Sequence, residues 1–370
     1  MGTRGIWHSG VRALKPKPAA WAVFPAIRAV IAAGAVAAVG AATGHMDAVG
    51  VAYFGAACAV VFITNGGYRT RLTMLAAQAF GAVAGIVLGI VLPHDPVVLI
   101  VTATVVGMLA GMLGVIGPAA TATAVMAVIG LAFGQFAGLP LPWWQQGAWY
   151  LAGTFVVAIA GVSPWILQRW RLNQHVAATA SKPSTTRSSF SERSRASFRV
   201  VTTPDAIRTG IRLALCMAIA TATVVALREP DHSYWLPLTV AVVVRPEYGS
   251  VFVRTVNRVV GTIIGATVAA LVLLVLPASW PIAVAAALAI GFAVFAAPKL
   301  YALSVIGITA SALLSASIGT PDPVFPLIRL LDTLLGCTIA VVFGYLLWPG
   351  SSIHLTSRQS NVPVEPVEPS

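Results

Sequence analysis

Arginine is the residue type in this sequence that can bind a charged small molecule and that recurs beside or within apolar stretches. Arg212 lies a full turn beyond Arg208 and inside an apolar run, where a charge is costly without a partner. Arg258 and Arg245 flank two further runs. A guanidinium group holds a carboxylate through paired hydrogen bonds, and partial dehydration strengthens them. These positions indicate a path for an organic anion. For Arg245 and Arg254, contact with lipid phosphates is the favoured alternative.

An interrupted apolar run beside these arginines extends the predicted path. The run begins Tyr234-Trp235-Leu236-Pro237 and stops at Arg245-Pro246-Glu247-Tyr248-Gly249. Proline ends a helix or leaves a carbonyl without its hydrogen bond, so polar backbone could line a cavity here. Short spans at equivalent places in two halves of a transporter point to a substrate site. The alternative is a short tilted helix with an ordinary turn. The predicted path comprises Arg212, Tyr234, Trp235, Pro237, Arg245, Glu247, Tyr248 and Arg258.

Asp332 is an acidic residue well inside a predicted span, which makes it a candidate proton carrier. Its distance of three residues from Arg329 also suits a local ion pair near the outer surface. Cys58, Cys216 and Cys337 each lie in an apolar run, and the histidines have no metal-ligand spacing. We therefore expect neither a metal site nor a cofactor. The sequence has no phosphate-binding loop, nucleophile elbow or HExxH motif, so we do not expect an enzyme.

The composition indicates that these residues belong to a membrane protein. The chain has 370 residues, of which 58% are hydrophobic and 9% are charged. A soluble globule ordinarily has roughly 25% charged residues. The net charge of +12 does not indicate nucleic acid, because Lys and Arg flank the apolar runs as they do in membrane proteins. We expect the chain to be surrounded by lipid and to bind no nucleic acid.

Apolar runs of membrane-spanning length divide the chain into about twelve predicted helices. Lys and Arg gather in the N-terminal segment, in several alternate connections and in the central linker, while acidic residues gather in the opposite loops. This bias predicts that both termini are cytoplasmic. The predicted spans lie near 25–43, 48–64, 72–92, 97–116, 119–136, 146–167, 208–227, 232–244, 257–276, 280–297, 301–318 and 327–348.

The two halves of the chain repeat each other. Arg28 matches Arg208 and Tyr68 matches Tyr248, both at a separation of 180 residues. Each half has an even number of predicted spans, so the copies share one orientation and form a parallel repeat about a pseudo-two-fold axis. Glycines in a small-xxx-small pattern are predicted to let the helices pack closely. They are Gly81, Gly85, Gly261 and Gly265.

The predicted fold class is an all-α polytopic transmembrane bundle of about 12 spans, arranged as two parallel six-helix repeats. A cytoplasmic N-terminal segment covers 1–24, and the first membrane repeat covers 25–167. A basic, flexible cytoplasmic linker at 168–205 precedes the second membrane repeat at 206–349. Composition predicts a disordered cytoplasmic tail at 350–370.

Three motifs of the second repeat follow one another in an order that is typical of a known family. They are Tyr234-Trp235-Leu236-Pro237-Leu238-Thr239, Arg245-Pro246-Glu247-Tyr248-Gly249 and Asn257-Arg258-Val259-Val260-Gly261. The second repeat resembles the fusaric acid resistance (FUSC) family, which is related to aromatic acid exporters and, more distantly, to plant aluminium-activated malate transporters. The first repeat departs from the pattern, because it has Gln78 where the second has Arg258. The resemblance implies a multi-pass protein of the bacterial inner membrane that exports aromatic or other organic acids.

We therefore expect a secondary transporter that exports small organic anions and is driven by the proton gradient. One alternative is a passive organic-anion channel, and another is a membrane scaffold whose basic linker recruits a protein partner or anionic lipid. The expected partners are the lipid bilayer and a small organic anion. Self-association into a homo-oligomer is left open.

Overall fold

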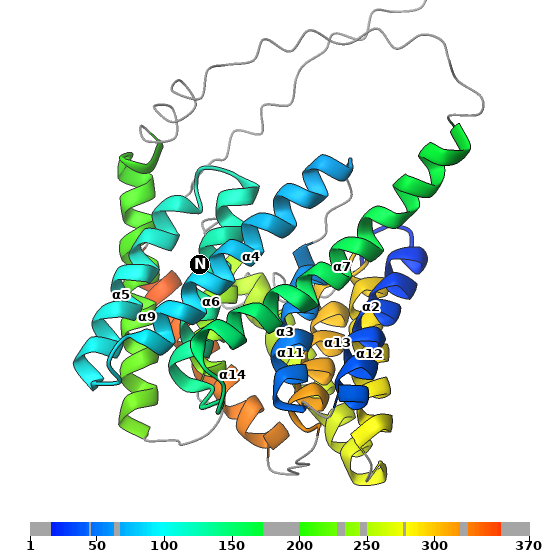
Figure 1. Cartoon of the computed structure of the whole chain (residues 1–370). Helices are drawn as coiled ribbons and strands as arrows, with labels where there is room; N and C mark the ends of the chain where they lie inside the picture. Colours follow the sequence, from blue (N-terminus) through cyan, green and yellow to red (C-terminus); the bar gives the residue numbers. More distant parts are fainter. Residues whose placement is uncertain are drawn as a thin grey trace, which may run out of the picture.

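Helices make up the secondary structure of the described part of the chain (Figure 1). The computed structural model describes residues 16–43, 46–62, 67–172, 200–227, 234–244, 250–276, 279–318 and 325–348. These ranges contain twelve α-helices, one π-helical segment and no strand. The predicted helical bundle is confirmed. Residues 1–15, most of the predicted linker and the predicted tail lie outside the described residues.

Each half contributes six α-helices. The first half consists of α2 (Val23–Thr43), α3 (Met46–Phe62), α4 (Tyr68–Val91), α5 (Pro96–Leu113), α6 (Pro118–Phe136) and α7 (Trp143–Leu172). The second half consists of α9 (Pro204–Leu227), α10 (Trp235–Val243), α11 (Ser250–Val275), α12 (Ser279–Ala296), α13 (Tyr301–Ala316) and α14 (Phe325–Val341). The π-helical segment η1 (Val342–Leu346) continues α14.

Several helices begin at residues that favour a helix start. The carboxylate of Asp95 accepts hydrogen bonds from the backbone N–H of Val97 at 2.9 Å and of Val98 at 3.3 Å, which caps α5. Pro96 and Pro118 are the first residues of α5 and α6, where a helix does not need their missing N–H.

Pro237 differs from its sequence-based interpretation. Helix α10 begins at Trp235, so Pro237 is in its first turn. The first turn has no intrahelical partner for its N–H groups, and proline at this position breaks no helical hydrogen bond. The proline therefore marks the start of a short helix and does not open a carbonyl within a longer one.

Many of the described helices have the dimensions of membrane spans. Seven are long and apolar enough to cross a membrane by length and composition, namely α2, α4, α5, α6, α9, α11 and α14 with η1. Helices α3, α12 and α13 are apolar but shorter, and α10 has only nine residues. Large apolar side chains such as Phe80 and Leu274, 71% and 74% exposed, form an outer surface suited to lipid. The chain is a multi-pass membrane protein.

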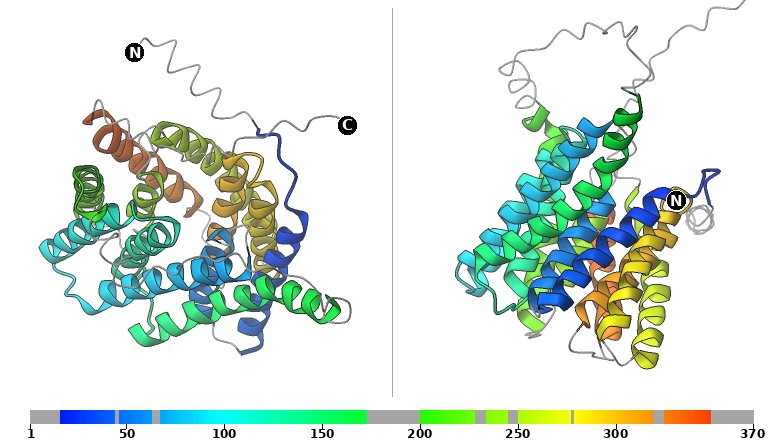
Figure 2. Two further views of the ribbon diagram at one scale, coloured as in Figure 1. Left: turned by 90° about the horizontal axis from the view of Figure 1, so that it is seen from above. Right: turned by 45° about the vertical axis from the view of Figure 1, so that its right-hand side comes forward.

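The packing of the helices repeats between the halves. Helix α4 packs on α6 as α11 packs on α13, and α3 packs on α7 as α10 packs on α14. The contacts between the halves also come in exchanged pairs, because α5 lies against α9 and α12 lies against α2. Seen from above, α2 and α9 lie on opposite sides of the bundle, as do α7 and α14 (Figure 2). The two halves are therefore parallel copies related by a pseudo-two-fold axis.

Close helix pairs within each half meet at glycine. A Cβ atom at Gly81 would overlap the carbonyl oxygen of Thr123 on α6, and one at Gly261 would overlap Ala302 and Val305 on α13. Gly85 and Gly265 meet the same partner helices further along. These contacts fix α4 against α6 and α11 against α13. Helices α6 and α13 lie at the inner faces of the two halves.

Candidate anion-binding site between the two halves

A cavity of about 770 Å³ lies between the two halves. Its walls come from α3 and α6 of the first half and from α10, α11, α12, α13 and α14 of the second. Pockets of roughly 300–1,000 Å³ accommodate drug-sized ligands. We call this space the central cavity.

The central cavity is long as well as large. Its lining residues on α13 begin at Tyr301 and continue to Ile318, just beyond the end of that helix, and those on α3 run from Gly50 to Phe62. At 1.5 Å per residue, the stretch along α13 is about 25 Å long. The hydrocarbon core of a bilayer is about 30 Å thick. The cavity therefore follows most of the length that a membrane path would need.

Aromatic side chains from both halves line the central cavity. Tyr53 and Phe54 on α3 correspond to Tyr234 and Trp235 at the start of α10, at an offset of 181 residues. The Phe133 ring stacks on Phe54 with centroids 4.8 Å apart and meets Tyr234 edge-on at 5.2 Å. Tyr234 lies 4.5 Å from Trp235. This aromatic chain crosses from one half to the other.

Two arginines of the second half face the central cavity. Arg258 is 3% exposed and Arg329 is 2% exposed, and both line the cavity. The guanidinium carbon of Arg329 lies 4.0 Å from the centroid of the Trp235 ring. Its Nη1 donates to the Trp235 carbonyl and to Thr239 Oγ1, each at 3.4 Å, which is longer than the usual N–H···O range of about 2.7–3.2 Å. The Nε atoms of Arg258 and Arg329 make no hydrogen bond within the described part of the chain.

Asp332 completes the charged cluster. It lies one turn after Arg329 on α14 and is 6% exposed. Its charge attracts that of Arg329, while Arg258 is near enough to repel Arg329. Asp332 is not among the residues that line the cavity. Arg329 and Asp332 are thus both buried and attract each other within the bundle.

The equivalent cluster of the first half is neutral. Gln78 corresponds to Arg258, and Gln146 corresponds to Arg329 at an offset of 183 residues. Tyr150 donates a hydrogen bond to Gln78 Oε1 at 2.8 Å, and Gln78 Nε2 donates to Thr154 at 3.3 Å. The first-half wall of the cavity has no charged side chain among its described residues. The cavity therefore has one charged wall and one neutral wall.

A hydrogen bond joins the halves beside the cavity. The hydroxyl groups of Tyr53 on α3 and Ser311 on α13 are 2.7 Å apart, and both residues line the cavity. Each is 1% exposed. This bond connects the inner helices of the first and second halves.

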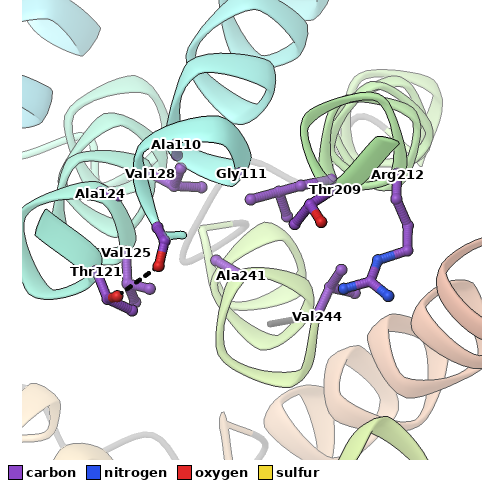
Figure 3. Close-up of a pocket in the computed structure, with 12 residues that line it drawn as sticks. Ala110, Gly111, Thr121, Ala124, Val125, Val128, Thr209, Arg212, Ala241 and Val244 are labelled. Carbon is purple, nitrogen blue, oxygen red and sulfur yellow. Dashed lines mark hydrogen bonds between the residues drawn. The ribbon is translucent and has the colours of Figure 1, made fainter. Parts of the chain in front are cut away.

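Arg212 faces a different pocket (Figure 3). That space measures about 20 Å³, enough for about one water molecule. Thr121 lines it and donates a hydrogen bond from Oγ1 to the Gly114 carbonyl at 2.8 Å. The side chain of Arg212 extends from α9 alongside Val244 (Figure 3).

The structure brings together some of the residues singled out from sequence. Tyr234, Trp235 and Arg258 line the central cavity, whereas Arg212 lines the smaller pocket. Pro237 is buried in α10 but is not a cavity-lining residue. The three remaining members of the predicted path lie outside the described residues. They are Arg245, Glu247 and Tyr248.

Tyr53, Ser311 and Arg329 are cavity residues that were not among the predicted site residues. Arg329 was interpreted as one partner of an ion pair, and nothing in the pattern around Ser311 marks a site. The match of Tyr53 with Tyr234 was the available signal for Tyr53. Among the described residues, no group of three or more His, Cys, Asp or Glu side chains could hold a metal ion.

Comparison with known proteins finds a family match that covers both cavity arginines. Residues 215–343 match the family described as fusaric acid resistance protein-like. This match confirms the FUSC resemblance. The FUSC-like segment contains Arg258, Arg329 and Asp332 but not Arg212.

Curated relatives share a comparable length of sequence. The uncharacterized protein YhfK of Escherichia coli is 30% identical over 146 residues, which is 39% of this chain and 21% of that protein. The uncharacterized protein slr1298 of Synechocystis is 31% identical over 144 residues, or 38% and 18% of the two chains. An uncharacterized protein of Haemophilus influenzae is 33% identical over 152 residues, or 39% and 20%. The match thus spans about a fifth of the length of these relatives. No solved structure matches the chain.

Proposed function

We propose that the protein is a secondary transporter of organic-acid anions and that the central cavity is the path of the anion. The observation that carries the proposal is the pair of buried guanidinium groups, Arg258 and Arg329, facing a cavity of about 770 Å³. A charge buried at membrane depth is costly unless it is compensated, and it marks a substrate path by default. Among the described residues, Asp332 is the carboxylate that acts on Arg329, so the two arginines leave positive charge for an anion to neutralise.

The walls of the cavity favour an anion with an apolar body. Phe54, Met126 and Phe133 line the neutral wall, and Trp235 covers one side of Arg329. A carboxylate on the arginines would leave its apolar part against these aromatic and aliphatic side chains. An aromatic acid has this combination of a charged group and a flat apolar ring.

The direction and location of transport follow from the resemblance and from the charge bias of the loops. The FUSC resemblance supports efflux from a bacterial cell, and the loop charges support cytoplasmic termini in the inner membrane. Efflux in this orientation would move the anion away from the negative side of the membrane.

The test replaces each arginine by the residue that the first half has at the equivalent position. Arg258→Gln and Arg329→Gln place glutamine where Gln78 and Gln146 occur. Purified protein in proteoliposomes would be tested for benzoate binding and benzoate flux. We expect each variant to bind benzoate at least about tenfold more weakly, because charge-assisted hydrogen bonds contribute about 1.5–3 kcal/mol.

The matched control is Arg254→Gln. Arg254 lies one turn before Arg258 on α11 and is not a cavity-lining residue. The control should bind and transport benzoate as the unmodified protein does. Unchanged benzoate binding in both cavity variants, or an equal loss in the control, would contradict the proposal.

A passive organic-anion channel is the second candidate, because the cavity continues for about 25 Å along α13. Recordings in planar bilayers distinguish the two functions. Unitary benzoate currents indicate a channel, whereas gradient-coupled flux without unitary currents indicates a carrier.

A further inference from the structure

The described residues place a small set of charges beside the central cavity. Arg258 and Arg329 are positive, and Asp332 is negative, so the cluster with ionised Asp332 has one net positive charge. Tyr234 and Cys337 also interact electrostatically with Arg329, and both side chains are ordinarily neutral at neutral pH. Arg212 is the other buried arginine of the described residues, but it lines the smaller pocket and is not among the charges that act on Arg329.

The opposite wall supplies no further charge. Gln78 and Gln146 occupy the positions equivalent to the two arginines, and Tyr53 and Cys58 are the polar residues that α3 contributes to the lining. Among the described residues that line the cavity, the charge that a bound anion meets therefore comes from the second half.

We propose that the central cavity selects singly charged organic anions over doubly charged ones, and that Asp332 sets this preference. The proposal rests on the anion site described above. One carboxylate makes the cluster and ligand neutral together, whereas a second carboxylate leaves an uncompensated negative charge in a site with little water. Asp332 acts through Arg329 and does not need to touch the ligand.

This charge balance has a consequence for the driving force. A monoanion neutralises the cluster without the uptake of a proton, so in this proposal no proton accompanies the anion and each transport cycle moves one negative charge. Transport should then respond to the membrane potential, at about 2.3 kcal/mol per elementary charge for each 100 mV.

The test compares two ligands with the same ring and different charge. Monomethyl terephthalate has one carboxylate, and terephthalate has two on the same ring. Both would compete against radiolabelled benzoate on the purified full chain at neutral pH. We expect the unmodified protein to prefer the monoester by at least about tenfold, since an extra unit charge within a few ångströms changes binding by this order or more.

Asp332→Asn removes the negative charge with almost no change in shape, and Asp332→Glu retains it. The asparagine variant should lose the preference for the monoester or reverse it, through a gain in terephthalate affinity of about tenfold or more. The glutamate variant should keep the preference. An unchanged preference in Asp332→Asn, with a thermal midpoint close to that of the unmodified protein, would overturn the role of Asp332.

Two further readouts keep the proposal testable if Asp332→Asn does not fold. Equal binding of the two ligands to the unmodified protein would overturn the charge selection, while the anion site itself would stand. Benzoate flux that ignores an imposed potassium diffusion potential and follows only the pH gradient would also overturn it. Failure of the unmodified protein to bind benzoate or the monoester would instead remove the proposed function.

Discussion

Trp235 positions the guanidinium group of Arg329 in two ways. Its ring lies 4.0 Å from the guanidinium carbon, and its carbonyl oxygen accepts a hydrogen bond from Nη1 at 3.4 Å. A cation–π contact holds the guanidinium group over the ring without using its N–H donors, which can then bind other groups. The Trp235 ring thus belongs to the proposed anion site together with the guanidinium group of Arg329.

Replacing the Trp235 side chain tests the contribution of the ring. Trp235→Leu removes the ring and keeps the carbonyl, and we expect benzoate to bind about two- to thirtyfold more weakly, because a cation–π contact is worth about 0.5–2 kcal/mol. Trp235→Phe keeps a ring and matches Phe54 of the first half, so it should lose less affinity. Benzoate titration of both variants measures the difference. Equal losses would show that the ring does not position Arg329.

At the scale of helices, glycine decides how closely α4 and α6 pack. Gly81 meets the backbone of Thr123, whereas Gly34 on α2 has no atom within 4 Å of the place that a Cβ would take. The same substitution should therefore have opposite effects at the two positions.

Gly81→Ala should lower the free energy of unfolding by about 1–3 kcal/mol, because the added methyl group forces the backbones apart. Gly34→Ala should raise the free energy of unfolding by about 0.5–1 kcal/mol, because alanine is the better helix former. Thermal midpoints in one detergent would report both changes. A destabilising effect of similar size at both positions would contradict this account of the α4–α6 contact.

An individual helix could be predicted from sequence where the residues of that helix alone determine its length and ends. Hydrophobic length gave the spans, and the series from Tyr234 to Pro237 predicted a short eighth span, which the structure shows as α10. The spacing of Arg329 and Asp332 predicted a pair on one helix, but a helix in isolation does not reveal which neighbour covers it. The burial of Arg329 under Trp235 depends on the packing of α10 against α14, and no periodicity within either segment encodes that contact.

At the scale of the molecule, the Tyr53–Ser311 hydrogen bond joins two bodies that an alternating-access cycle would move against each other. Tyr53→Phe should lower the free energy of unfolding by about 0.5–1.5 kcal/mol. It should also change benzoate flux more than benzoate affinity, because the bond joins the two halves and neither partner is an arginine of the proposed anion site.

Tyr150→Phe is the matched control for this variant. Tyr150 donates to Gln78 within the first half, so its loss should cost similar stability without altering the ratio of flux to affinity. Flux and binding measured on the same preparations separate the two variants. Identical changes in that ratio would indicate that the Tyr53–Ser311 hydrogen bond does not affect the transport cycle.

The two-fold arrangement was predictable from sequence, but the cavity on its axis was only partly so. Gly81 with Gly261 and Arg28 with Arg208 revealed two parallel copies. Aligning the last helices of the copies would have paired Gln146 with Arg329 and exposed the second charge difference. The volume of the central cavity could not be predicted from the sequence of either half, because it depends on how α3 and α6 pack against α10 and α13.

Because only one wall of the central cavity is charged, the duplicated fold does not offer a ligand two equivalent binding poses. If Gln78 and Gln146 were arginines, a ligand near the pseudo-axis would have two equivalent poses, related by a half-turn and occupied equally. With arginines at 258 and 329 only, one pose has its carboxylate against cations and the other has it against the uncharged first-half wall. In the proposed function, a duplicated scaffold thereby acquires a single binding mode: the second half binds the carboxylate, and the first half contacts the apolar part of the anion.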